Sequence, residues 1–262
     1  MPELTEVEGY RSLAADAALG RVVSHVAAPD GWWLKNGLTE RMLRKALVGR
    51  RFVEARRTGK VLFLDTDQEG PTLALRFGMT GKLLVDGRNR VGRLLSEPKK
   101  DKPIYARLRI DFDDGGEMRV TDPRRLGGAA LDPDERLLGP DVTGFDLEAL
   151  REMLAGSQAP LKYRLMDQKR IGGIGNLMAD EMLWRAGLRP DRPAGGLDEE
   201  EVQRLYKHLM RTLKVLMTRG ASSSGDFMPY RTRGGRCPKD GAALERTQIG
   251  GRTTWWCPQH QT

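Results

Sequence analysis

The spacing of apolar residues changes near the middle of the 262-residue chain, and this change restricts the folds that the chain can adopt. Between residue 21 and about residue 126, short β-like runs alternate with turn signals. From residue 146 onward, apolar residues recur at helical spacing instead. This order of β-rich and then helical sequence predicts an α+β protein of one or two domains with a small appendage.

Turn and capping signals give approximate boundaries for the elements. The β-like runs cover residues 61–64, 73–77, 82–85 and 106–112. Thr5 and Glu8 have the spacing of a helix capping box, which predicts a first helix of about four turns before Gly20. Further helices are predicted at residues 39–48, 146–155, 160–169, 176–186 and 198–218. Prolines and glycines within residues 132–141 mark a linker.

The charge balance favours a polyanionic partner, because 44 Lys and Arg residues exceed 36 Asp and Glu residues and give a net charge of +8. No apolar stretch approaches the ~20 residues that a membrane helix needs, and the first residues do not resemble a secretion signal. We therefore expect a cytosolic protein that does not associate with membranes. In that compartment the two cysteines, Cys237 and Cys257, favour a metal site, with a disulfide as the alternative.

The first residues carry a potential nucleophile. Removal of Met1 would leave Pro2 as a free secondary amine beside the carboxylate of Glu3. A terminal amine titrates near pH ~7.7–8.0, so an appreciable fraction is unprotonated at neutral pH and can attack the aldehyde carbon of a sugar. Glu3 can then move protons. Proline and glutamate also follow an initiator methionine by chance, so the rest of the chain must decide between these readings.

Four matches, of which these first residues are one, follow one another in order and span nearly the whole chain. Residues 2–8 read Pro-Glu-Leu-Thr-Glu-Val-Glu, and residues 165–181 hold three glycines within four positions before Asn176. Together with residues 56–62 and the pair of segments 76–81 and 121–127, they resemble the formamidopyrimidine-DNA glycosylase and endonuclease VIII family, closer to its formamidopyrimidine branch. The family has a second proline where this chain has Thr5, and either residue suits a helix start.

The resemblance implies roles for a hairpin and two loops. Lys60, beside a glycine in a tight turn, would contact a phosphate that flanks the damaged nucleotide; a solvated charged turn is the alternative. Arg76 stands where the family usually has histidine, and Met79 would fill the hole left by the extruded nucleotide. Arg124 and Leu126 would enter the base stack, with Leu126 in place of the usual phenylalanine. Burial of Met79 and Leu126 in the core is the alternative.

The resemblance extends to a helix–two-turn–helix element in the second half of the chain. Asn176 begins a helix whose amino terminus favours an anion. Lys162 and Arg252 are assigned to DNA binding with it, Arg252 from a hairpin that presents an arginine to a phosphate. A packing role for the glycine-rich loop before Asn176 is the alternative.

The carboxyl-terminal segment departs most from the family, whose zinc finger normally has four cysteines. This chain keeps the spacing but offers two cysteines, an aspartate and a histidine. These residues would bind one structural Zn²⁺: Cys237, Asp240, Cys257 and His260. A finger without zinc is the alternative, because fewer thiolates bind the metal less tightly.

The family fold and reaction follow from the resemblance. It implies an N-terminal catalytic β-sandwich with flanking helices at residues 1–131, a helix–two-turn–helix domain at 132–225, and a zinc-finger-like β-hairpin at 226–262. The activity would be that of a bifunctional DNA glycosylase and abasic-site lyase. Pro2 would form a Schiff base at C1′, Glu3 would act as acid, Glu6 would position the terminus, Lys60 would assist, and β- and δ-elimination would cleave the strand.

The partner implied is double-stranded DNA with a damaged base or an abasic site, bound by a monomer at the nucleoid of a bacterial cytoplasm, with no organic cofactor. The sequence does not identify which damaged base is excised. Only sixteen residues separate Gly220 from Cys237, where members that repair 8-oxoguanine carry a longer loop. Formamidopyrimidines, oxidised pyrimidines, hydantoins and bulky lesions are comparable candidates. The alternative function is a non-catalytic binder of damaged or abasic DNA on the same scaffold.

Overall fold

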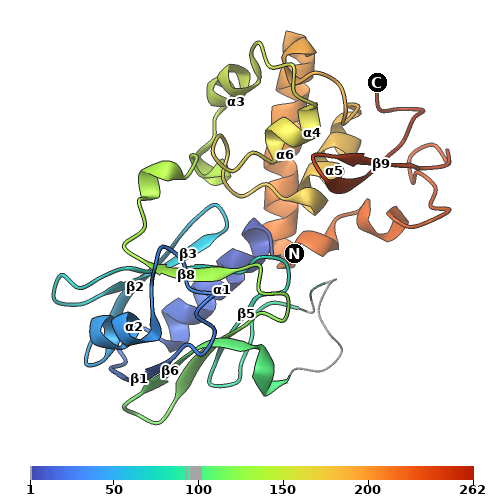
Figure 1. Cartoon of the computed structure of the whole chain (residues 1–262). Helices are drawn as coiled ribbons and strands as arrows, with labels where there is room; N and C mark the ends of the chain where they lie inside the picture. The colour runs from blue at the N-terminus through green and yellow to red at the C-terminus, as the bar shows by residue number, and fades with distance from the viewer. Residues whose placement is uncertain (1, 93, 95–101) are drawn as a thin grey trace. The chain divides into compact units, whose positions relative to one another are not determined.

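The computed structural model describes residues 2–92, 94 and 102–262. The chain divides into two compact units, Met1–Glu135 and Arg136–Thr262. The first unit contains the two larger sheets, and the second contains four of the α-helices and a small β-hairpin (Figure 1). The α+β class predicted from the sequence is confirmed.

Two four-stranded antiparallel sheets form the first unit. One has the strand order β1-β6-β7-β5, made by Val23–Ala27, Ala106–Phe112, Glu117–Thr121 and Lys82–Val85. The other has the order β2-β3-β4-β8, made by Phe52–Thr58, Val61–Thr66, Leu73–Arg76 and Gly128–Leu131. Apolar residues from both sheets belong to one buried cluster. The sheets therefore pack as a sandwich around a shared core.

The strands follow from their sequence patterns. In β6, Leu108, Ile110 and Phe112 are buried and alternate with Arg107, Arg109 and Asp111, as expected for a strand with one face toward the core. Strand β3 opens with four consecutive apolar residues and is buried along nearly its whole length, as expected for a strand in the interior of its sheet.

Two α-helices flank this sandwich. Helix α1, Leu4–Ala17, buries Val7, Tyr10 and Leu13 in the shared cluster. Helix α2, Glu40–Leu47, begins after the N-cap Thr39, whose hydroxyl accepts a hydrogen bond from Met42 N. A short 3₁₀ turn, Pro103–Tyr105, precedes β6.

The capping box of α1 lies elsewhere than predicted. The N-cap is Glu3, and its backbone N–H donates to Glu6 Oε2 at 2.9 Å. Thr5 is inside the first turn, with a buried hydroxyl that has no partner among the described residues. The predicted Thr5–Glu8 box is therefore wrong, because a glutamate N-cap starts the helix one residue before Thr5.

The second unit is mainly helical. Its α-helices are α3 Leu147–Leu154, α4 Leu161–Leu165, α5 Asn176–Ala186 and α6 Glu199–Arg219. Short 3₁₀ turns lie at Glu135–Leu137, Val142–Gly144, Ala194–Gly196, Ser222–Ser224 and Met228–Tyr230. Helix α6 starts with a capping box between Asp198 and Glu201 and ends at Gly220, whose φ of 73° favours glycine.

Helix α4 ends four residues earlier than predicted. The side chain of Gln168 donates to Met166 O and Ile174 O, so it serves the loop rather than continuing the helix. The same side chain also accepts a hydrogen bond, from Gly173 N to Gln168 Oε1 at 3.1 Å.

The carboxyl-terminal finger shares its core with the helical region. Its hairpin consists of β9, Glu245–Ile249, and β10, Arg252–Trp256. Trp184 of α5 stacks on Phe227 with ring centroids 5.2 Å apart, and both pack with Cys237 and Cys257. This common core explains why the finger is part of the second unit and not a unit of its own. No helix in the described part of the chain has the length and apolar character to span a membrane.

Candidate active site and metal centre

The first turn of α1 gathers the residues predicted to start the reaction. Pro2 is buried, and Glu3 and Glu6 are 0% and 2% exposed. Glu6 accepts the backbone N–H of Glu3, so its carboxylate fixes the chain directly after Pro2. The helix dipole favours both carboxylates at this end. Loss of Met1, which lies outside the described residues, would place the new secondary amine in this turn.

The turn that carries Lys60 is tied to the same helix. Residues 59–60 connect β2 to β3, and Gly59 has a φ of 56°, which favours glycine. Arg57 donates to Glu8 Oε2 of α1 at 3.0 Å and to Gly59 O at 2.9 Å. Lys60 itself is half-buried. The sandwich thus positions the lysine turn against the helix that begins with the predicted catalytic residues.

Helix α1 also holds the first of the two predicted reading loops. Tyr10 donates its hydroxyl to Gly81 O at 3.1 Å, and its ring lies 4.4 Å from the ring of Phe77. These contacts anchor both ends of the loop that carries Met79. Met79 is half-buried and Arg76 is exposed, so neither belongs to the core cluster.

The two reading loops approach each other backbone to backbone. A Cβ added at Gly78 would lie 2.5 Å from Leu126 C, so only glycine permits this approach. Leu126 is 50% exposed and Arg124 is exposed as well. The core alternative for Leu126 is therefore wrong, and its side chain is available to a partner.

A buried carboxylate that the sequence did not single out organises these loops. Asp122 is fully buried, and its side chain accepts from Thr80 Oγ1 at 2.7 Å and from Gly127 N at 2.7 Å. Trp33 Nε1 donates to it at 3.2 Å. Asp122 therefore links the loop of Met79, the loop of Leu126 and the segment around Trp33.

In the second unit, the glycine-rich loop delivers Asn176 to the start of α5. Gly175 is the N-cap and Asn176 the first helical residue, which is the position where backbone N–H groups favour an anion. The side-chain oxygen of Asn176 is buried without a hydrogen-bond partner among the described residues.

Lys162 does not have the surroundings expected of a phosphate contact. It is 0% exposed, and its Nζ lies 2.6 Å from Asp180 Oδ1. The ammonium also donates to Thr254 Oγ1 at 2.8 Å and to Thr253 O at 3.2 Å. The predicted direct DNA contact of Lys162 is thus not supported, because its charge is already paired inside the unit.

Asp180 connects this lysine to two further segments. Its Oδ2 accepts from Arg231 Nη2 at 2.6 Å and from the backbone N–H of Trp255 at 3.2 Å. The next residue, Glu181, accepts the backbone N–H groups of Asp226 and Phe227. Helix α5 thereby fixes both the hairpin strand β10 and the segment that precedes the finger.

The hairpin presents Arg252 to solvent. Its turn is Gly250-Gly251, with φ values of 57° and 71°, as a two-residue hairpin turn requires. A Cβ at Gly250 would lie 2.4 Å from the Tyr163 ring, so α4 packs directly on this turn. Arg252 is exposed at the start of β10.

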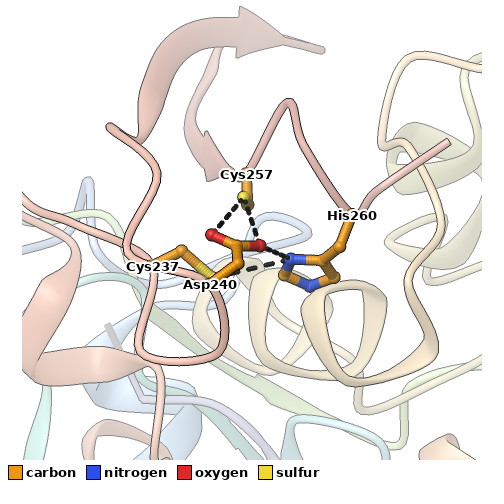
Figure 2. Close-up of side chains that lie close together, drawn as sticks. All are labelled: Cys237, Asp240, Cys257 and His260. Carbon is orange, nitrogen blue, oxygen red and sulfur yellow. Dashed lines mark hydrogen bonds and ion pairs between the residues drawn. The ribbon is translucent and has the colours of Figure 1, made fainter.

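The four predicted metal ligands converge at the base of the hairpin (Figure 2). One donor atom from each lies within 4.8 Å of the others: Cys237, Asp240, Cys257 and His260. Three of the separations are 3.5 Å for Cys237 Sγ to His260 Nδ1, 3.2 Å for Cys257 Sγ to Asp240 Oδ2, and 2.8 Å for His260 Nδ1 to Asp240 Oδ2. The edges of a tetrahedron around Zn²⁺ are roughly 3.2–3.8 Å, from the usual bond lengths.

Neighbouring groups prepare these residues as ligands. His260 Nε2 lies 3.1 Å from Trp184 O, and a proton on Nε2 leaves Nδ1 free to bind a metal. Trp184 Nε1 and Lys239 N both donate to Cys237 Sγ at 3.4 Å, which fixes the position of this sulfur. Burial raises the pKa of the Cys257 thiol to about 11, so a bound metal must displace that proton. Both cysteines are free, so the disulfide alternative is not realised. The donor set fits Zn²⁺.

Comparison with known proteins decides the family. The family model for the N-terminal domain of formamidopyrimidine-DNA glycosylase matches residues 1–129, and the model for its helix–two-turn–helix domain matches residues 138–228. The formamidopyrimidine-DNA glycosylase of Carboxydothermus hydrogenoformans is 34% identical over 279 residues, with 100% of each chain covered. The chain belongs to the formamidopyrimidine-DNA glycosylase family. The family predicted from the sequence is confirmed, and the chain is a DNA repair glycosylase that binds DNA.

Solved structures of family members agree with the fold. The Lactococcus lactis glycosylase in complex with DNA containing Fapy-dG has a TM-score of 0.83 and 25% identity, covering 99% of this chain and 100% of that chain. Its complex with DNA containing an oxidised pyrimidine has the same TM-score and identity, with 100% of both chains covered.

Most of the predicted site residues fall into two groups, one in each unit. In the first unit, α1, the Lys60 turn and the two reading loops are joined by hydrogen bonds and close packing. In the second, Asn176, Arg252 and the metal ligands surround α5. Asp122, Arg57 and Asp180 were missed, because a carboxylate or guanidinium that bonds backbone groups leaves no spacing pattern in a sequence.

Proposed function

We propose that this family member is a bifunctional DNA glycosylase and abasic-site lyase with Pro2 as the nucleophile. The observation that carries the proposal is the first turn of α1. There Pro2 and Glu3 are buried, Glu6 fixes the chain between them, and Arg57 brings the Lys60 turn to the same helix. A binding protein has no need to bury two carboxylates beside a potential amine, since each costs free energy to remove from water.

In the proposed reaction, the Pro2 amine attacks C1′ of an extruded nucleotide as the bond from C1′ to the damaged base breaks. Glu3, as the acid, passes a proton to the departing base, takes up the proton that the amine nitrogen loses, and delivers it to O4′ as the sugar ring opens, so the product is an iminium joining Pro2 to C1′. Loss of a proton from C2′ expels the 3′ phosphate, and a second elimination expels the 5′ phosphate. Hydrolysis of the remaining imine returns the free Pro2 amine.

Cations and helix ends would hold the DNA backbone. Lys60 contacts a phosphate next to the lesion, and Asn176 and Arg252 contact other phosphates, which agrees with the basic balance of the chain. Met79, Arg124 and Leu126 fill the space left by the extruded nucleotide, and Arg76 lies at the base of the Met79 loop. The structural role of Lys162 is indirect, through the hairpin that carries Arg252.

We further propose that recognition of the lesion does not depend on a loop folding over the base. The segment before the finger is pinned to α5: Glu181 accepts two of its backbone N–H groups, and Arg231 is paired with Asp180. A Cβ at Gly225 would lie 2.4 Å from Glu181, so this packing is close. Ring-opened purines and oxidised pyrimidines, both named in complexes of the Lactococcus relative, are the substrates favoured over 8-oxoguanine.

The finger completes the proposal. One structural Zn²⁺ would be held by Cys237, Asp240, Cys257 and His260, where it would supply only a fixed junction between the finger and α5. The protein would act as a monomer on chromosomal DNA in a bacterial cytoplasm.

The test uses protein whose amino-terminal processing has been verified by mass spectrometry. Pro2→Gly should reduce borohydride trapping on abasic duplex DNA by more than roughly tenfold, because it replaces the positioned secondary amine, while duplex affinity stays close to wild type. A processed variant that traps at the wild-type rate would remove Pro2 as the nucleophile.

The second candidate is a non-catalytic binder of damaged or abasic DNA, and the exchanges at Leu126, Asp240 and His260 favour it. A panel of lesion-bearing duplexes, scored for base release and for borohydride trapping, separates the two functions. A binder would show lesion-dependent affinity with neither base release nor trapping.

A further inference from the structure

An exposed tryptophan stands beside the second reading loop. Trp32 is 61% exposed, although tryptophan is usually largely buried in a folded protein. The residue next to it, Trp33, is fully buried and donates to Asp122. The chain therefore directs one indole into the core and its neighbour to solvent.

The segment that carries Trp32 is joined to the reading loop along its length. Lys35 N donates to Ala129 O at 2.9 Å, and Leu34 forms a parallel bridge with Ala129. Through Trp33 the segment shares the carboxylate of Asp122 with the loop. The backbone that carries Trp32 is thus held by the same contacts that shape the loop of Leu126.

A second connection comes from the residue before Leu126. Arg125 has a φ of 58°, a conformation that side chains other than glycine seldom adopt. It forms two hydrogen bonds of 2.7 Å to Asp30, and its guanidinium lies 5.0 Å from the Trp32 ring centroid. The strained backbone and the bidentate pair together hold Arg125 against the indole.

Lys35 supplies a further cation. Its Nζ lies 4.4 Å from the Trp32 ring centroid and donates to Trp32 O at 3.1 Å. Within the part of the chain that the structure describes, no carboxylate pairs with this ammonium. With both cations beside it, Trp32 is still 61% exposed. The group formed by Trp32, Lys35 and Arg125, here called the Trp32 patch, offers an aromatic face with positive charge at its border.

We propose that the Trp32 patch is a further DNA-contacting site, in which the indole packs against a nucleoside of the strands opened by the reading loop and Lys35 faces a phosphate. An aromatic face bordered by cations suits a nucleotide, because bases stack on indoles and phosphates attract ammonium groups. The inference rests on the proposed function, since it needs a duplex opened at a lesion.

The Trp32 patch would also provide the aromatic ring that the reading loop of Leu126 does not have. Leu126 can wedge between bases but offers no aromatic ring, whereas Trp32 provides one on a segment bonded to that loop. Trp32 thus supplies the stacking surface that position 126 lacks in this chain.

The experiment compares Trp32→Ala, Trp32→Phe and the control Val53→Ala, whose side chain is 53% exposed on β2. Affinity is measured for a duplex with a tetrahydrofuran abasic analogue. Loss of one stacked base weakens binding by roughly 5- to 100-fold, so Trp32→Ala should lose an amount in this range. Trp32→Phe and Val53→Ala should stay within about twofold of wild type. Circular dichroism and thermal unfolding confirm that each variant is folded.

A direct readout identifies the contact. Duplexes with 5-iodouracil at successive positions around the lesion are irradiated with wild-type protein, and the crosslinked peptide is identified by mass spectrometry. Wild type should crosslink through Trp32 at one position, and Trp32→Ala should lose that product. Wild-type affinity of Trp32→Ala together with no crosslink at Trp32 would overturn the proposal and assign the patch to another partner or to none.

Borohydride trapping at saturating protein separates this inference from the proposed function. Trp32→Ala should trap at close to the wild-type rate once bound, because the patch holds DNA but does not touch the reacting carbon. If wild type traps but Trp32 affects neither affinity nor crosslinking, the proposed lyase activity stands and the proposed DNA contact of the Trp32 patch is refuted. If wild type never traps and Trp32→Ala still loses affinity, the proposed DNA contact stands and the proposed lyase activity is refuted.

Discussion

Replacement of Asp180 by asparagine should destabilise the second unit and displace the hairpin that carries Arg252. Asp180 is 2% exposed and lies within 2.6 Å of both Lys162, which is buried, and Arg231, whose side chain is 7% exposed. The asparagine keeps the size of the side chain but removes its charge. The ammonium of Lys162, 0% exposed, then loses the carboxylate that lies 2.6 Å from it in the interior.

The expected magnitude follows from this burial. Removal of one partner from a buried ion pair costs about 3–5 kcal/mol, because the other charge stays desolvated. For a unit of this size, 1 kcal/mol shifts the unfolding temperature by roughly 3–5 °C, so the transition of the second unit should fall by roughly 10–20 °C. Asp191→Asn provides a matched control, because its pair with Arg189 is exposed on both sides. That pair contributes at most about 1 kcal/mol.

Differential scanning calorimetry measures the stability, and DNA binding measures the position of the hairpin. At a temperature where the variant is folded, Asp180→Asn should weaken DNA binding, and adding Arg252→Ala should weaken it little further, because both changes remove the same phosphate contact. An unfolding shift as small as that of Asp191→Asn would refute the reasoning. Full additivity of the two DNA-binding losses would show that the network does not position Arg252.

Three further variants test separate parts of the site. Glu3→Gln should impair excision of a damaged base more than lyase action on a preformed abasic site, since only excision must expel a base; equal losses in the two assays would contradict that role. Arg252→Ala should weaken binding to all duplexes alike and reduce the slope of log K against log salt by roughly one; an unchanged slope would place Arg252 away from the backbone. His260→Ala should lose most of about one equivalent of zinc, measured by elemental analysis of protein purified without chelators; metal-free wild type with full DNA affinity would rule out a zinc junction.

The sequence predicted the elements whose own residues determine them. The bounds of β5 and β6 and of α5 agree with the predicted ranges, because apolar periodicity and glycines at the ends are local signals. The start of α1 was predicted wrongly. Thr5 and Glu8 have the spacing of a capping box, but the hydrogen bonds of the capping box are made by Glu3 and Glu6. The spacing alone cannot decide which pair faces the free backbone N–H groups.

Long-range contacts explain the remaining differences. Lys162 was assigned to DNA binding together with the helix–two-turn–helix element, and only the fold shows that Asp180 and Thr254 receive its ammonium. Asp122 likewise bonds partners that are 42 and 89 residues away in the chain. The metal ligands were predictable because their spacing within each pair is local, and their convergence was then confirmed.

The hairpin has two separate attachments to α5, and the second of them does not depend on a bound metal. One attachment is the candidate metal site, which reaches α5 through Trp184. The other is Asp180, which bonds β10 and Lys162 without any metal. Because the Asp180 attachment remains when the metal site is weak, the hairpin can keep Arg252 in position. Chelation should therefore reduce DNA affinity only modestly in wild type and little further in Asp180→Asn, where the Arg252 contact is already lost. A chelator effect in wild type as large as the loss caused by Asp180→Asn would show that the metal site, and not Asp180, holds the hairpin.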